Sequence, residues 1–494
     1  MGIIKRQSIL GSIFLFIGVF IGFLTSSVIF PKVLNEEQIG LLSTLVSYST
    51  LFGQIGTLGF TSVTIRMFSY FRNKQNHHNG YFFITTMVIL IGFFVTLILF
   101  FLLKPVIISQ NIKNAPLFVE YIYYLIPLIF FTITFLIVDV YNAVLYQSVR
   151  GIFLKEFIQR VLILLFVILY YYQMYSFKVY VGLYVFSLSL PAVLLLIWLA
   201  VDGEFVLKPN LAFITPELKK TMINMSFFGI LHGIAGIAAV QADKIMLSSM
   251  LSLEATGIYT VVFVFAALIR VPSRAILKIA MAVIADAWKE NNLDEISKIY
   301  RSTAINQYII GLLIFIGLWA NIHNIFRILP PAYETGKYVI FFLGLAYTFF
   351  MAGGASNSII ASSKYYQYLN WFIIAYFFLI IISNYIFISL WGITGAAIAS
   401  ALSLSLFVLS KILFVYFKFG IQPFNFKFII ISLIGLTTYF FSSQIPVFDN
   451  LYLDIFIRSS FITIIYTLLT LVFKISADIN EIFDKYLKKL GLKN

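Results

Sequence analysis

Long apolar segments separated by short polar connections run through the whole chain. Fourteen segments can be placed, each long enough to cross the hydrocarbon core of a bilayer as a helix of about 20 residues. They are predicted at 8–30, 39–65, 81–103, 117–146, 152–171, 179–201, 221–250, 256–285, 302–326, 336–361, 367–388, 391–416, 425–443 and 453–474. The connections are too short to house a folded domain. The pattern therefore predicts an all-α polytopic membrane protein with about fourteen transmembrane helices.

The pattern is less regular at two places. Segments eleven and twelve are separated only by Ser389-Leu390, before Trp391-Gly392. Residues 475–494 form a tail with apolar residues at spacings of three and four, which predicts an amphipathic helix on the cytoplasmic membrane surface. The alternative is a disordered charged tail. The apolar positions are Ile479, Ile482, Phe483, Tyr486, Leu487 and Leu490, and the basic ones are Lys485, Lys488 and Lys489.

A short segment of the chain recurs. Glu37-Gln38-Ile39-Gly40 matches Glu254-Ala255-Thr256-Gly257, and each copy opens an even-numbered span. Gly182 and Gly392 open spans six and twelve in the same way. This predicts two related six-helix lobes with the same orientation, at 1–208 and 209–420, as in transporters built from parallel repeats. An extra helix pair at 421–474 would follow them.

Composition supports the membrane interpretation. Of 494 residues, 61% are hydrophobic and only 11% are charged, against about 25% charged in a soluble protein. One set of alternating connections carries 21 Lys and Arg, whereas the other carries 6. By the positive-inside rule this asymmetry places both termini in the cytoplasm. The net charge of +14 is dispersed over short loops, so nucleic-acid binding is not expected.

Basic residues inside spans are candidate functional groups, because an unpaired charge in hydrocarbon is costly. Arg270, Arg274 and Lys278 follow one another at intervals of four on span eight, beside Pro272. On a continuous helix they would form one cationic stripe in the cytoplasmic half of the membrane, able to hold a diphosphate. The alternative is that they extend toward anionic lipid headgroups. Arg66, at the end of span two, could complete the same site from the other lobe.

Other polar groups inside the spans have competing interpretations. Arg160 and Asp139 lie at comparable depths, and we expect them to neutralise each other. Asp243 and Lys244 point about 100° apart on one helix, so we expect them to have different partners. His232 is a candidate coupling residue or a helix–helix hydrogen-bonding residue. No metal-ligand spacing, phosphate loop or nucleophile motif is present in the sequence, so no cofactor or metal is expected.

Two stretches carry a family resemblance. One is Gln241-Ala242-Asp243-Lys244-Ile245-Met246-Leu247, followed by Leu253-Glu254-Ala255-Thr256-Gly257-Ile258-Tyr259. The other is Glu37-x-x-Gly40, followed by Gly56-Thr57-Leu58-Gly59-Phe60 and Arg66. With the fourteen-helix plan, they resemble the polysaccharide flippases of the multidrug/oligosaccharidyl-lipid/polysaccharide exporter superfamily. The chain departs from the resemblance at Ala282-Val283-Ile284-Ala285, where many relatives have Phe-Pro.

The resemblance implies a transporter of the bacterial inner membrane that works by alternating access and needs no ATP-binding domain. Its implied substrate is an undecaprenyl-diphosphate-linked oligosaccharide, the precursor of O-antigen (in lipopolysaccharide), capsule or exopolysaccharide. Membrane lipids, a polysaccharide polymerase and glycosyltransferases are the implied partners.

Other function classes remain open on the sequence. A drug/cation antiporter of the same superfamily is less favoured, because the first span has no acidic residue. The cavity expected around Arg270, Arg274, Lys278 and Arg66 would also be cationic, which suits an anionic diphosphate better than a cationic drug. A membrane polysaccharide polymerase or ligase would use an exposed acidic pair, which Glu36-Glu37 superficially offers. Glu37 has a repeat counterpart in Glu254, however, and this favours a role at a helix start. A membrane scaffold has no specific support.

Overall fold

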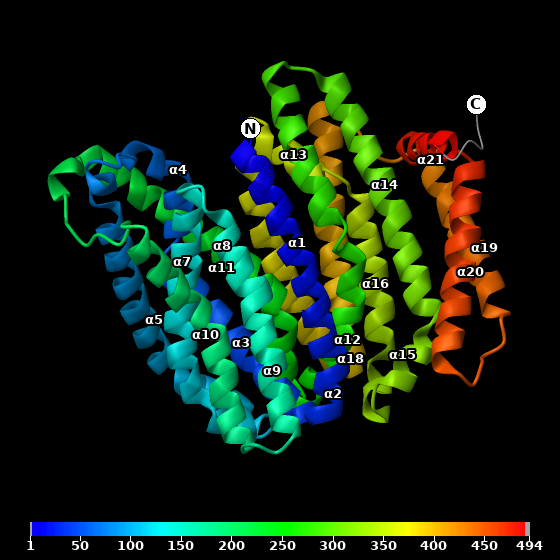
Figure 1. Ribbon diagram of the computed structural model, residues 1–494, viewed down its shortest axis with the longest axis horizontal. Helices are drawn as coiled ribbons and strands as arrows, with labels where there is room; N and C mark the ends of the chain where they lie inside the picture. Colours follow the sequence, from blue (N-terminus) through cyan, green and yellow to red (C-terminus); the bar gives the residue numbers. More distant parts are fainter. Residues whose placement is uncertain (1, 490–494) are drawn as a thin grey trace. The chain divides into compact units, whose positions relative to one another are not determined.

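The computed structural model describes residues 2–489, and every regular element in that part of the chain is a helix (Figure 1). An α-helix satisfies its own backbone hydrogen bonds, as a chain crossing a bilayer must. The chain divides into two compact units, Met1–Thr260 and Val261–Asn494, and the division falls within one helix, α12. Unit 1 therefore contains the helices of spans one to seven and the start of span eight. The lobe boundary near residue 208 remains a prediction.

Unit 1 is built from helices that match the first seven predicted spans. They are α1 (Gly2–Leu24), η1 (Thr25–Ile29), α2 (Phe30–Val33), α3 (Glu36–Gly56), α4 (Phe60–Phe71), η2 (His77–Gly80), α5 (Tyr81–Asn111), α6 (Pro116–Glu120), η3 (Ile122–Tyr124), α7 (Leu125–Val144), α8 (Ser148–Ile152), η4 (Phe153–Ile158), α9 (Gln159–Tyr171), α10 (Phe177–Val201), η5 (Leu211–Phe213), α11 (Pro216–Met250) and the start of α12 (Leu253–Ala267). Helix α3 packs against both α7 and α11.

Unit 2 contains the rest of α12 and the remaining spans. These are η6 (Leu268–Arg270), α13 (Ser273–Lys289), α14 (Leu293–Ala320), α15 (Ile322–Ile328), η7 (Pro331–Gly336), α16 (Lys337–Ala352), α17 (Ser356–Ser362), α18 (Tyr368–Phe419), α19 (Phe426–Ser443), α20 (Leu451–Val472) and α21 (Ala477–Lys489). Helix α16 packs against α14 and α18, and α19 packs against α14 and α20.

The predicted number of spans agrees with this set of helices. Eleven stretches of the described chain are long and apolar enough to cross a membrane. One of them, the 52-residue α18, contains predicted spans eleven and twelve, which meet at non-helical Trp391 and Gly392. These stretches account for twelve of the fourteen predicted spans. The remaining two predicted spans are less apolar: α3 is rich in Ser and Thr, and the α8–η4–α9 run carries four charged residues. The all-α polytopic fold with about fourteen spans is thereby confirmed.

Two predicted spans are broken, and this corrects the sequence interpretation. Span two ends at Gly56, and a turn through left-handed Leu58 and Gly59 separates α3 from α4. Span eight changes from α12 to one 3₁₀ turn, η6, and restarts as α13 after Pro272. Proline lacks an N–H and crowds the preceding turn, so a continuous helix is disfavoured there. The amphipathic helices α4 and α13 follow these breaks.

The tail forms the predicted helix as far as it is described. Figure 1 shows α21 lying across the end of α20. Asp478 accepts a hydrogen bond from Asn306 Nδ2 at 2.7 Å, so the start of α21 is attached to α14. Ile479 packs against the apolar cluster of α14, α19 and α20, whereas Ile482 is exposed. Leu490 and the residues after it lie outside the described part of the chain, and docking on the membrane surface remains a prediction.

Candidate functional site

The break in span eight positions the first candidate cation. Arg270 ends the 3₁₀ turn and is half-buried, with its guanidinium carbon 5.3 Å from the ring centre of Tyr347 and 5.4 Å from that of Phe350. Aromatic faces attract a cation but do not neutralise it, since each contact contributes only about 0.5–2 kcal/mol. The side chain of Arg270 is therefore held against α16 by its contacts with the two rings.

The other two members of the predicted stripe lie beyond the break. Arg274 and Lys278 are exposed on α13, one helical turn apart. The three residues do not lie on one continuous α-helix, because a 3₁₀ turn and Pro272 separate Arg270 from Arg274. A shared cationic stripe remains a prediction. Within residues 2–489, none of these cations forms an ion pair with a carboxylate. Three positive charges thus remain available to an external anion.

Arg66 lies on α4 rather than at the end of the predicted span. It is exposed, and the turn that separates it from α3 is closely packed. A methyl group at Gly59 would come within 2.2 Å of the carbonyl oxygen of Ser226, and the φ of Gly59 is +67°. Glycine is required there, because a larger residue would be both strained and blocked. This turn fixes where α4, and with it Arg66, begins.

The expected pair of Arg160 and Asp139 is not formed. Arg160 instead forms an ion pair with Glu156, four residues earlier, and donates from Nη1 to the carbonyl oxygen of Gly18 at 2.6 Å. The carboxylate of Asp139 lies against Gly151, where an added methyl group would meet it at 1.6 Å. A π-helical turn, η4, ends at Ile158 and rotates the helix locally. The separation of four residues between Glu156 and Arg160 was a signal in the sequence for this pair, whereas the contact with Gly18 needed the tertiary structure.

Asp243 and His232 lie on α11. Asp243 is buried and accepts a hydrogen bond from the hydroxyl of Tyr259 on α12, so its partner comes from a neighbouring helix, as expected. Lys244 beside it is half-buried. His232 is exposed and makes no hydrogen bond with the described residues, so the helix–helix role considered for it is not found. A coupling role for His232 remains a prediction.

A cluster of buried charges in unit 2 was missed by the sequence reasoning. Asp454 is fully buried and accepts hydrogen bonds from Arg458 Nη2 at 3.2 Å, from the backbone N–H of Phe448 at 3.1 Å and from the side chain of Asn324. Its second oxygen lies 2.9 Å from His323 Nε2. The sequence did contain a signal for this ion pair, because Asp454 and Arg458 are four positions apart on one apolar helix, where their side chains are neighbours.

Lys411 is a second residue that the sequence reasoning passed over. It is 4% exposed in the second half of α18, and its ammonium lies 4.0 Å from the ring centre of Phe407. No carboxylate within residues 2–489 forms an ion pair with it. A lysine inside an apolar span is itself a signal of function, so Lys411 belongs among the candidate residues.

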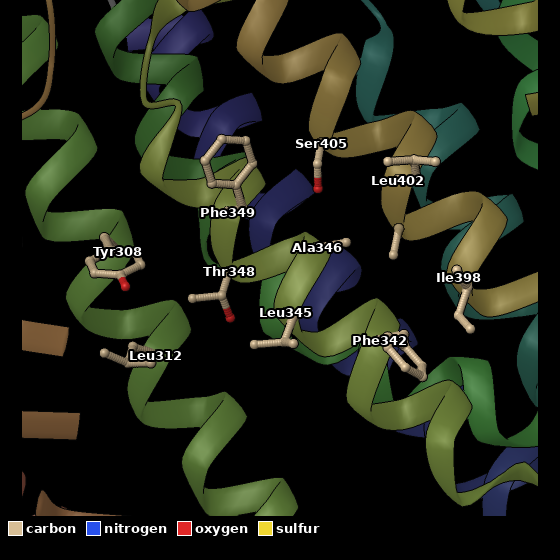
Figure 2. Close-up of a pocket in the computed structure, with 11 residues that line it drawn as sticks. Tyr308, Leu312, Phe342, Leu345, Ala346, Thr348, Phe349, Ile398, Leu402 and Ser405 are labelled. Atoms are coloured by element: carbon tan, nitrogen blue, oxygen red, sulfur yellow. The ribbon is translucent and has the colours of Figure 1, made fainter. Parts of the chain in front are cut away.

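An apolar cavity of about 500 Å³ lies between α14, α16 and α18 of unit 2 (Figure 2). It is lined by Tyr308, Leu312, Phe342, Leu345, Ala346, Thr348, Phe349, Ile398, Ala401, Leu402 and Ser405. Tyr347 and Phe349 point about 200° apart on a helix. Arg270, which lies on Tyr347, is therefore on the other face of α16 from the cavity. This lining suits hydrocarbon rather than a charged group.

Solved structures with the same architecture are transporters. "Lipid II flippase MurJ, inward closed conformation" has a TM-score of 0.76 at 15% identity, covering 94% of this chain and 98% of that one. A "multidrug resistance MATE family transporter of the MOP superfamily", inward-facing, has a TM-score of 0.65 at 13% identity, covering 80% and 94%. At these identities the likeness shows a shared fold. No curated protein matches the sequence.

A family model described as "Polysaccharide biosynthesis protein" matches residues 6–285, which is more than half of the chain. The match includes the repeated Glu-x-x-Gly segments, the Asp243–Lys244 stretch and the broken span with Arg270 and Arg274. The match identifies this chain as a member of the polysaccharide biosynthesis protein family.

Proposed function

We propose that the protein moves a lipid-linked oligosaccharide across the cytoplasmic membrane, with an undecaprenyl diphosphate carrier, for O-antigen, capsule or exopolysaccharide synthesis. Alternating access between two six-helix lobes, 1–208 and 209–420, would expose the substrate to each side in turn. The step is transport without covalent chemistry. Family membership supports the substrate class, and the fold supports the transport mechanism.

The cationic break in span eight is the observation that carries this proposal. Arg270 and Arg274 flank Pro272 and have no carboxylate partner among the described residues. Their guanidinium groups can each donate two parallel hydrogen bonds to phosphate oxygens, whereas Lys278 contributes a single point charge. A diphosphate supplies the negative charge that this segment lacks. Arg66 is a further proposed phosphate contact.

Helices around the break would leave the lipid tail in an apolar environment. The diphosphate must be held while its hydrocarbon chain stays in the bilayer, because transferring that chain to water costs about 0.8 kcal/mol per CH₂ group. Unit 2 offers an apolar cavity on the other face of α16 from Arg270. In this proposal the diphosphate of the substrate binds the cations at the break in span eight, and its hydrocarbon chain contacts the apolar surroundings.

Proteoliposomes containing the purified protein test the proposal directly. We expect movement of a fluorescent polyprenyl-diphosphate oligosaccharide between leaflets, and weaker movement of the monophosphate analogue. Arg301→Ala is the control for loss of an arginine outside the proposed site, and it should move the lipid at the wild-type rate. Arg301 is exposed, and its Nε donates to the carbonyl oxygen of Gln422. Transport of a cationic dye without movement of the diphosphate lipid would contradict the proposal and favour the drug antiporter.

A further inference from the structure

A polar pocket of about 240 Å³ lies in unit 2, between the end of α14 and the start of α16. Its lining comes from α15, from the 3₁₀ segment η7 and from the first residue of α16. The lining residues are Ile322, His323, Phe326, Arg327, Glu334 and Lys337. The pocket shares no lining residue with the apolar cavity, and it does not include the break in span eight. It is therefore a separate place in unit 2 where a ligand has room to bind.

Aromatic residues place this pocket at the level of the lipid headgroups. Trp319, one residue before the end of α14, lies 4.7 Å from Phe341 between ring centres, and the ammonium of Lys337 lies 5.9 Å from the centre of the Trp319 ring. Tyr338, next to Lys337, is 53% exposed. Tryptophan and tyrosine concentrate where hydrocarbon meets water, because their rings are apolar and their N–H or O–H groups are polar. A lipid headgroup is therefore the kind of ligand that can reach the pocket from the bilayer.

Opposite charges line the pocket without pairing. Within residues 2–489, neither the ammonium of Lys337 nor the carboxylate of Glu334 forms an ion pair. The connections predicted to lie outside carry only six basic residues, and two of them, Arg327 and Lys337, line this one pocket. Cations and a carboxylate thus border the same space, with no direct contact that would neutralise them.

Arg327 is held in place by backbone carbonyl groups. Its Nη1 donates to the carbonyl oxygen of Phe448 at 3.0 Å, and its Nη2 donates to that of Asp449 at 2.5 Å. Carbonyl oxygens carry only partial charges, so these bonds do not cancel the positive charge of the guanidinium. Its remaining N–H groups can donate to a ligand. The α19–α20 connection therefore positions a cation for the pocket.

His323 joins the pocket to the buried cluster around Asp454. Its Nε2 lies 2.9 Å from Asp454 Oδ2, and its side chain is 32% exposed, whereas that of Asp454 is fully buried. The carboxylate of Asp454 is also paired with Arg458, so its charge is compensated inside the protein. This cluster holds α15 in place, and it leaves the charge balance of the pocket to the other lining residues.

We propose that this pocket binds the phosphoethanolamine headgroup of a membrane phospholipid. The phosphate accepts hydrogen bonds from Arg327 and Lys337, and the carboxylate of Glu334 binds the ammonium group. A headgroup with a phosphate but no amine leaves Glu334 unpaired beside a negative charge, so the pocket favours the zwitterionic lipid. The positive-inside distribution predicts that this lipid comes from the outer leaflet. The site does not depend on what the protein transports.

Lipid selectivity of the purified protein tests the site. Phosphatidylethanolamine and phosphatidylglycerol with the same acyl chains are added in equal amounts in detergent, and native mass spectrometry measures how much of each stays bound. Wild type should retain about fivefold more phosphatidylethanolamine, the effect of one partly exposed ion pair. Glu334→Gln should abolish this preference. Equal retention of both lipids by wild type, or an unchanged preference in Glu334→Gln, would overturn the proposal.

Lys337→Gln tests the phosphate contact. It should lower the retention of phosphatidylethanolamine about fivefold and leave the fold intact, because Lys337 has no ion pair to lose within residues 2–489. Arg327→Gln is a less specific variant, since it also releases the α19–α20 connection. The matched controls are Lys32→Gln and Glu120→Gln, which remove exposed charges of unit 1 on the same predicted side. They should retain both lipids as wild type does, and unchanged retention by Lys337→Gln would contradict the site.

A thiol in the pocket shows where the lipid binds and whether its acyl chains are needed. The chain has no cysteine, so Ile322→Cys supplies a single thiol at a half-buried lining position. N-ethylmaleimide should label it about fivefold more slowly in nanodiscs that contain phosphatidylethanolamine than in nanodiscs of phosphatidylglycerol alone. Soluble O-phosphoethanolamine added to the latter should give no protection, because it has no acyl chains to concentrate it at the bilayer.

The labelling outcomes separate this site from its alternatives. Equal labelling in the two kinds of nanodisc would overturn the site. Protection by O-phosphoethanolamine equal to that by the lipid would overturn the membrane source of the ligand. Neither measurement involves transport, so loss of diphosphate-lipid movement in proteoliposomes would contradict the proposed function and leave the headgroup site standing.

Discussion

Unit 2 contains two groups of charged residues that differ in whether they have partners within the protein. At one end, near the start of α20, Asp454 and Arg458 are buried together, and each charge has partners within the protein. In contrast, the segment from Arg270 to Lys278, where α12 gives way to α13, has no carboxylate partner among the described residues. Both groups consist of charged residues within apolar spans, and the apolar pattern along the chain does not distinguish them.

The difference separates structural charges from available ones. A buried pair with full hydrogen bonding has no remaining capacity for a ligand, and removing one partner leaves an uncompensated charge. Arg458 also donates from Nη1 to the carbonyl oxygen of Ser442 at 2.7 Å, so the cluster fixes the α19–α20 connection. The guanidinium of Arg270 lies against Tyr347 and Phe350 and forms no ion pair within residues 2–489, so it can bind an anion.

Labelling from outside should give an all-or-none difference between the two ends. A thiol in Asn450→Cys, beside the Asp454 cluster, should react with an impermeant maleimide in intact cells, because the positive-inside distribution places it outside. A thiol in Asn291→Cys, just after α13, should react only after permeabilisation. Equal reaction of both positions in intact cells would contradict the predicted topology.

Asp454→Ala should abolish most of the folded protein. It leaves Arg458 buried without its carboxylate, and breaking such a pair costs about 3–5 kcal/mol. The thermal melting temperature in detergent and the amount of protein in the membrane should both fall. The double variant Asp454→Leu/Arg458→Met should recover much of the stability, because no buried charge remains. A stable Asp454→Ala protein would show that the cluster is dispensable.

Arg270→Ala/Arg274→Ala should leave abundance and melting temperature unchanged while substrate movement falls at least tenfold, since tenfold corresponds to about 1.4 kcal/mol of lost phosphate interaction. Lysine at either position should retain part of the activity, because it keeps the charge but loses the forked geometry. Transport in proteoliposomes, normalised to protein amount, is the measurement. Normal transport by a stable double variant would make this segment merely interfacial.

Lys278→Ala should have the smallest effect, a loss of about two- to fivefold, because exposed charges typically contribute only about 0.2–1 kcal/mol. Its contribution should shrink further as salt is added, owing to screening of the exposed charge. Comparing initial rates at low and high ionic strength checks both points. A loss as large as that of Arg270→Ala would mean that Lys278 is buried in the substrate complex.

Periodicity predicted the helices well but not their interruptions. The fourteen spans follow from apolar length, whereas the break after Gly56 depends on a left-handed turn at Gly59 that packs against Ser226. The break at Pro272 was visible as a proline, yet the cations around it were aligned as though the helix continued. The partner of Arg160 is Glu156, four residues earlier on the same helix, rather than Asp139 on another span.

The sequence by itself determined the membrane fold and the approximate number of spans, because these depend on local hydrophobicity. It also predicted a repeat, from matching segments at a fixed separation along the chain. Only the tertiary structure decided which charges are neutralised and which side chains meet. The repeat illustrates both parts: the 217-residue offset is in the sequence, but the contact of Gly40 with Leu253 and of Ser43 with Thr260 needed coordinates. Contacts between distant segments depend on how helices bend and pack, and no local pattern encodes that.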